Sequence, residues 1–198
     1  MNQVLLNGNE YKIQEKDLPY LVIYGEKSGG SHFTITLIKD LFLSGSKILF
    51  FTAFPMAKDN FLEQIGNKHT TLAFVNSTED LENHRDSQVI ILDSGNEDLF
   101  INAVKNLEDI KDRVVLVKNI EAFSKQVFDS CLGLNKIIFS GHIDNCVAKE
   151  EVIKKSYKNI VIFTKPEIPI KIDIPDLEKW CGYLSSENLT GIIKVKID

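Results

Sequence analysis

The residues with the clearest chemical potential form a short glycine-rich stretch, 25–32, near the start of the chain. It follows an apolar run at 21–24 and precedes a helix-like pattern that begins near Ser31. A buried strand that leads through such a turn into a helix N-terminus favours an anion, because backbone N–H groups and the helix dipole both point at it. We therefore predict contact with a nucleotide phosphate, with a simple strand-to-helix turn as the alternative. The residues assigned to this role are Gly25, Lys27, Ser28, Gly29, Gly30, Ser31 and His32.

The stretch departs from the standard phosphate loop, which reads G-x-x-x-x-G-K-[ST]. Gly25 and Gly30 keep the glycine spacing, but Ser31 stands where the lysine is expected and His32 where the hydroxyl residue is expected. In the standard loop the lysine contacts the β- and γ-phosphates, and the hydroxyl binds Mg²⁺. Lys27 comes too early in the loop, where it either reaches a phosphate or stays solvated.

One acid follows a strongly apolar run in a position that could serve a metal ion. Asp93 ends the run 89–92, and the carboxyl end of such a strand lies at the ligand-binding edge of a parallel sheet. The alternative is that Asp93 caps the helix that follows it.

Apolar runs and segments of helical period alternate over residues 20–165, which predicts a mainly parallel sheet with right-handed crossovers. Helices on both faces make the expected fold class three-layer α/β. The stretch at 25–32 would lie at the edge of this sheet where ligands bind. Strands are expected at 20–25, 47–53, 70–75, 89–95, 113–119, 136–141 and 159–164, and helices at 31–44, 55–66, 96–108, 120–132 and 147–155.

The two ends of the chain carry different signals. Asn7-Gly8 predicts a hairpin over residues 3–14, because both central positions of its turn need a positive φ. After Pro166 we expect a short helix near 177–184 and a half-exposed or edge strand at 192–197. The predicted organisation is an N-terminal hairpin and linker at 1–19, an α/β domain at 20–165, and a C-terminal β extension at 166–198 packed on the same domain.

Over about residues 20–165, this order of strand, glycine loop, helix and later acid-ending strand resembles the P-loop NTPases. In one alignment, 48–62 resembles the second strand and helix of RecA- and KaiC-like ATPases, and 89–94 resembles their Walker B strand. In the other, 29–33 is similar to a segment of DnaA-like AAA+ proteins with its lysine deleted. There, 114–123 resembles the Walker B segment with Lys118-Asn119 in place of its acidic pair, and 137–140 resembles the sensor strand. Both alignments stay open.

The resemblance implies ATP and Mg²⁺ as ligands, with Asp93 as a possible Mg²⁺ ligand and Ser31 as another if the second alignment holds. The altered Walker A and B motifs predict little hydrolysis, since phosphoryl transfer depends on positioning and charge neutralisation. The catalytic Glu that RecA-like enzymes carry past the second strand is also missing from 53–56. We expect a pseudo-ATPase, binding nucleotide weakly or not at all, with homo- or hetero-oligomeric partners. It would act as a subunit or scaffold in an ATPase or nucleic-acid-processing assembly.

Other functions are weighed against this one. An active NTPase would use Lys27, or a lysine from a neighbouring subunit. A hydrolase would use Ser28, Asp93 and His142, but the G-x-S-x-G motif is absent. A dinucleotide site lacks an acid after the second strand. Phe54 and Met56, beyond that strand, are expected in the core, with a partner-binding lip as the alternative.

Composition sets outer bounds on these functions. The net charge of −5 disfavours a broad nucleic-acid surface, so nucleic acid would be met through partners or a local patch. No apolar stretch approaches a membrane span, and the N-terminus does not resemble a signal peptide, so we expect a cytoplasmic protein. The Cys and His residues show neither disulfide nor metal-site spacing: Cys131, Cys146, Cys181, His32, His69, His84 and His142.

Overall fold

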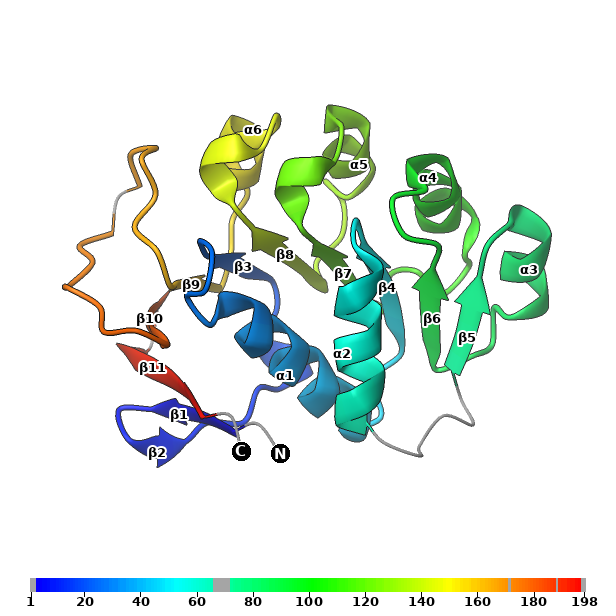
Figure 1. Ribbon diagram of the computed structural model, residues 1–198. Coiled ribbons are helices and arrows are strands. Elements are labelled where there is room, and N and C mark those ends of the chain that lie inside the picture. The colour runs from blue at the N-terminus through cyan, green and yellow to red at the C-terminus, as the bar shows by residue number, and fades with distance from the viewer. Residues whose placement is uncertain (1–2, 66–71, 171, 188, 197–198) are drawn as a thin grey trace.

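The computed structural model describes residues 3–65, 72–170, 172–187 and 189–196, and these residues form one 11-stranded sheet (Figure 1). The order is β2-β1-β11-β10-β9-β3-β8-β7-β4-β6-β5. The strands are β1 Gln3–Leu6, β2 Asn9–Glu10, β3 Tyr20–Ile23, β4 Ile48–Thr52, β5 Leu72–Val75, β6 Val89–Leu92, β7 Val114–Lys118, β8 Ile137–Gly141, β9 Asn159–Ile162, β10 Cys181–Ser186 and β11 Thr190–Lys196. The start of the strand expected at 70–75, and His69, lie outside the described residues.

The strands from β9 to β5 all pair in parallel, as continuous apolar runs favour when both faces are covered. One apolar core joins α1 and α2 to one face, and a second joins α3, α4, α5 and α6 to the other. The helices are α1 Gly30–Leu43, α2 Pro55–Ile65, α3 Thr78–Asn83, α4 Glu97–Asn106, α5 Lys125–Ser130 and α6 Lys149–Lys154, with short 3₁₀ turns η1 Glu15–Asp17, η3 Ile120–Ala122 and η4 Ile143–Asn145. The predicted three-layer α/β fold is confirmed.

The N-terminal hairpin forms as predicted. Asn7 and Gly8 have φ values of 49° and 86°, and β1 pairs with β2 in antiparallel fashion. The other side of β1 pairs with β11, also antiparallel. The hairpin therefore continues the main sheet.

One part of the C-terminal prediction is wrong. Residues 181–186 form β10, between β9 and β11, so the described residues near 177–184 do not form the expected helix. Pairing with a strand on each side decides the structure here over a short helical spacing of apolar residues. The last strand has both buried and exposed side chains, as the half-exposed alternative predicts, and it lies between β10 and β1, so it is not an edge strand.

Side-chain exposure corrects one more expectation. Phe54 and Met56 are 53% and 72% exposed, so the core position expected for them is wrong. They follow β4, at the same edge of the sheet as the loop after β3. All three cysteines are buried and free. No helix in the described part of the chain has the length and apolarity needed to cross a membrane.

Candidate functional site

A cavity of about 350 Å³ opens where the loop after β3 meets the ends of β7 and β8. Figure 1 shows the loop that leads from β3 into α1, both in blue. Six of the seven loop residues proposed from the sequence line the cavity, and the seventh, Gly30, is buried. The lining residues are Tyr24, Gly25, Glu26, Lys27, Ser28, Gly29, Ser31, His32, Lys118, Asn119, His142 and Trp180.

The glycines of the loop are required by its geometry. Gly29 has a φ of 95° and precedes the first residue of α1. A Cβ at position 30 would lie 2.6 Å from Cγ of Tyr24 and closer still to its Cβ, so only glycine lets the helix approach the strand this closely. The Gly25 N–H donates to Oγ1 of Thr164 at 2.9 Å, which ties the loop to the end of β9.

The start of α1 offers donors to an anion. The first N–H groups of a helix have no acceptor inside it, and here they belong to Gly30, Ser31 and His32. Residues 30–43 form a helix long enough for its dipole to add to the attraction. The Ser28 hydroxyl donates to the Gly25 carbonyl at 2.8 Å, so it stabilises the loop.

A lysine from a distant part of the chain enters the same cavity. Lys118, the last residue of β7, is only 3% exposed, and its Nζ donates to the Tyr24 hydroxyl at 3.1 Å. Burial lowers the pKa of Lys118 to about 8, an effect that the Glu121 carboxylate partly offsets. Burial raises the pKa of Tyr24, so the phenol that receives the hydrogen bond is neutral.

The aromatic residues of the cavity come from both ends of the chain. The rings of His32 and Trp180 lie 5.4 Å apart, and those of Tyr24 and His142 lie 5.7 Å apart. Burial, and then the charge of Lys118, lower the pKa of His32, so its imidazole is neutral at pH 7. Sequence reasoning missed Trp180, although it is the single tryptophan of the chain.

The structure does not bring Asp93 to this cavity. Asp93 is exposed beyond β6, four strand positions from β3, which is about 19 Å at the usual strand spacing. The Asn96 side chain, which accepts from the Leu99 N–H at 3.1 Å, caps α4 in place of Asp93. Ser28 and His142 share the cavity, but the acid expected to complete a hydrolase triad lies elsewhere.

The end of β7 is much nearer to the loop. It lies two strand positions from β3, about 10 Å, and Lys118 spans that gap to reach Tyr24. The next residue, Asn119, adopts a left-handed conformation with a φ of 66°, and its Oδ1 accepts from the Thr52 hydroxyl at 3.0 Å. Lysine and a bonded amide therefore stand where the second alignment expects an acidic pair.

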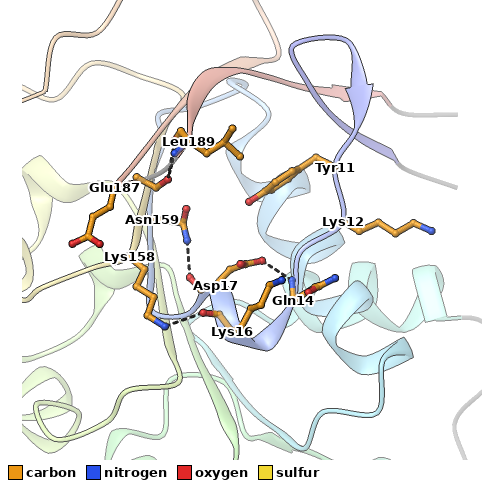
Figure 2. Close-up of a pocket in the computed structure, with 10 residues that line it drawn as sticks. Tyr11, Lys12, Gln14, Lys16, Asp17, Lys158, Asn159, Glu187 and Leu189 are labelled. Atoms are coloured by element: carbon orange, nitrogen blue, oxygen red, sulfur yellow. Dashed lines mark hydrogen bonds between the residues drawn. The ribbon is translucent and has the colours of Figure 1, made fainter.

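A larger cavity, of about 560 Å³, lies at the opposite edge of the sheet (Figure 2). Its three lysines, Lys12, Lys16 and Lys158, are all exposed. The Lys158 ammonium donates to the Lys16 carbonyl at 2.9 Å, and the Asn159 amide donates to the Asp17 carbonyl at 2.6 Å. These polar groups hold the segment before β3 in place. Because they already bond to the chain itself, we assign this cavity no ligand.

Comparison with the models of known protein families gives no match, and comparison with characterised protein sequences gives none either. Solved structures do match. The genome packaging NTPase B204 from Sulfolobus turreted icosahedral virus 2, in complex with ATP-gammaS, has a TM-score of 0.59 and 14% identity over 93% of this chain and 98% of that chain. The chain has the P-loop NTPase fold.

Two further matches support the same assignment of the fold. The B204 complex with sulfate has a TM-score of 0.57 and 15% identity over 90% of this chain and 96% of that chain. EssC (ATPases 2 and 3) from Geobacillus thermodenitrificans has a TM-score of 0.56 and 10% identity over 94% of this chain and 38% of that chain. At such low identity, the likeness concerns the fold.

Proposed function

We propose that the chain is a pseudo-ATPase, a P-loop domain that binds nucleotide phosphates and hydrolyses them very slowly or not at all. The main support is that the backbone of the phosphate-binding loop is retained while the charged side chains around it have changed. The loop and the start of α1 present their N–H groups to the cavity, but Ser31 replaces the loop lysine. Lys118 then stands at the strand end where an acidic pair would bind a metal ion.

The position of β7 favours the DnaA-like AAA+ alignment over the RecA-like one. The side chain that ends β7 reaches the loop, whereas Asp93 beyond β6 is about 19 Å from β3 by strand spacing. Fast phosphoryl transfer needs a positioned water and a neutralised phosphate charge together. A single carboxylate, Glu26, is found among the described residues that line the cavity, and it is exposed.

A role within an assembly fits this chemistry. Solved structures with the same fold include a genome packaging NTPase and tandem ATPase domains of EssC. Exposed Phe54 and Met56 lie at the same edge of the sheet as the cavity and offer apolar contacts to a neighbouring subunit. We therefore assign the chain a subunit or scaffold role in a cytoplasmic ATPase or nucleic-acid-processing assembly.

Ligand-dependent stabilisation and turnover together test this function. ATP, GTP and pyrophosphate should each raise the melting temperature, because a ligand specific to the folded state stabilises it. Phosphate release from Mg-ATP should stay far below the roughly 1 s⁻¹ at the slow end of ordinary enzymes. No shift with any of these ligands would remove nucleotide binding, and turnover at ordinary rates would remove the pseudo-ATPase.

The second candidate is an active ATPase that uses Lys27. It is favoured by one observation: Lys27 lines the cavity, with its backbone at a φ of 54°. If turnover is found, Lys27→Ala should abolish it. Unchanged turnover in that variant would exclude Lys27 as the catalytic lysine, and Lys16→Ala, at the opposite edge of the sheet, is the matched control.

A further inference from the structure

Lys118 is a buried cation whose charge the folded chain compensates only in part. Within the described part of the chain, its ammonium donates one side-chain hydrogen bond, to the neutral phenol of Tyr24. Among the described residues, no carboxylate forms an ion pair with Lys118, and Glu121 acts on it only through space. Burying a charge without an ion-pair partner is unfavourable. The cavity therefore favours a ligand that brings a negative charge to Lys118.

The unpaired Lys118 and the loop that has lost its own lysine line the same cavity. Lys118, Ser31 and His32 all line it. The charge of Lys118 is close enough to His32 to lower the pKa of the imidazole. An anion held by the N–H groups at the start of α1 would therefore lie near the Lys118 ammonium.

We propose that Lys118 supplies, from the end of β7, the phosphate-binding cation that the loop lacks, and that the cavity binds a diphosphate or triphosphate chain without a divalent cation. This rests on the proposed function, since it names how the same cavity holds its ligand. Lys118 is here a binding residue that contacts the ligand directly, as ammonium groups do in other phosphate sites.

The donor set around the cavity does not fit Mg²⁺. Mg²⁺ requires an octahedron of oxygen ligands, usually with one or two carboxylates. Among the described lining residues, Glu26 is the single carboxylate, and it is exposed. The Lys118 ammonium occupies the strand end from which a carboxylate would come, and it repels a second cation.

Calorimetric titration of the full chain with inorganic pyrophosphate, in EDTA and again in excess Mg²⁺, tests this directly. The wild type should bind at least as tightly in EDTA as in Mg²⁺. Lys118→Met should weaken binding about 10- to 100-fold, which corresponds to the loss of one charge-assisted hydrogen bond. Lys158→Met, in the cavity at the opposite edge, is the matched control and should bind as the wild type does.

The outcomes separate this inference from the proposed function. Binding that needs Mg²⁺, or that Lys118→Met leaves unchanged, overturns the inference and leaves nucleotide binding standing. Absence of binding by pyrophosphate and ATP in both buffers overturns both. Circular dichroism and thermal unfolding of Lys118→Met exclude misfolding as the cause of lost binding, and ATP in EDTA serves as the second probe.

Discussion

Strand β7 has a buried cation at each end, and the two differ in how the fold treats them. Arg113, just before the strand, has a fully buried side chain that donates from Nε to Asp109 at 2.8 Å and from Nη1 to the Ser87 carbonyl at 2.9 Å. Its Nη2 donates to the Arg85 carbonyl. Lys118, at the other end, donates to one neutral phenol. The first cation is satisfied by the fold, and the second is left for a ligand.

The largest effect is expected at the Arg113 end of β7. Asp109→Ala leaves the Arg113 guanidinium buried without its counter-ion, which should cost about 3–5 kcal/mol of unfolding free energy, measured by urea denaturation. Asp129→Ala is the control, because Asp129 pairs with exposed Lys125 and should matter by less than about 1 kcal/mol. Equal losses in the two variants would contradict a structural role for Arg113.

At the Lys118 end of β7, removing the cation should stabilise the fold. Lys118→Met removes a buried charge whose pKa falls from 10.5 to about 8. The free energy of unfolding at pH 7 should therefore rise, by an upper limit of roughly 3 kcal/mol. Lys111→Met, which replaces an exposed lysine before β7, should change it by less than about 0.5 kcal/mol. A Lys118→Met variant less stable than the wild type would mean that the fold does satisfy this lysine.

A third change tests the close approach of loop and strand beside Lys118. Gly30→Ala places a methyl group against Tyr24, the hydrogen-bond partner of Lys118, and should cost about 1–3 kcal/mol by overpacking. Gly133→Ala is the control, because an added Cβ there meets nothing within 4 Å. Urea denaturation measures both. The geometry of the loop would be in error if Gly30→Ala were as stable as Gly133→Ala.

The effect that is smallest per step is a pH dependence, because it is spread over the range from pH 8 to pH 10.5. The unfolded chain keeps the Lys118 proton up to about pH 10.5, and the folded chain releases it near pH 8. Between these values the unfolded state binds more protons, so the wild type gains stability as pH rises, by at most about 1.4 kcal/mol per unit. Lys118→Met lacks this gain, and its advantage should vanish between pH 8 and pH 10.5. Urea denaturation at a series of pH values measures this. If the difference in unfolding free energy between Lys118→Met and the wild type stayed constant over this range, the burial of a charge would be contradicted.

Much of the fold follows from the sequence, because buried parallel strands are continuous apolar runs. The hairpin at Asn7-Gly8 and the glycine loop were also predictable from backbone requirements alone. The strand at 181–186 was not, since its pairing with β9 and β11 is non-local. Neither the domain boundary at 165 nor the Mg²⁺ role of Asp93 and Ser31 is tested by the fold.

The site could be predicted only where its residues are neighbours in the sequence. The loop residues adjoin one another in the sequence, so their spacing was informative. Lys118 was visible as a departure from an acidic pair, and its position beside the loop depends on the order of strands in the sheet. Trp180 comes from the turn before β10, and its packing against Gly29 has no local signal.

The protonation of Lys118 itself gives the most direct test. Nuclear magnetic resonance of protein with labelled lysine side chains, assigned by the signal lost in Lys118→Met, yields its pKa with and without pyrophosphate in EDTA. We expect a pKa of about 8 in the free protein and a rise towards the roughly 10.4 of an ordinary lysine once pyrophosphate is bound. An ordinary pKa in the free protein, or a value that bound pyrophosphate leaves unchanged, would contradict this expectation.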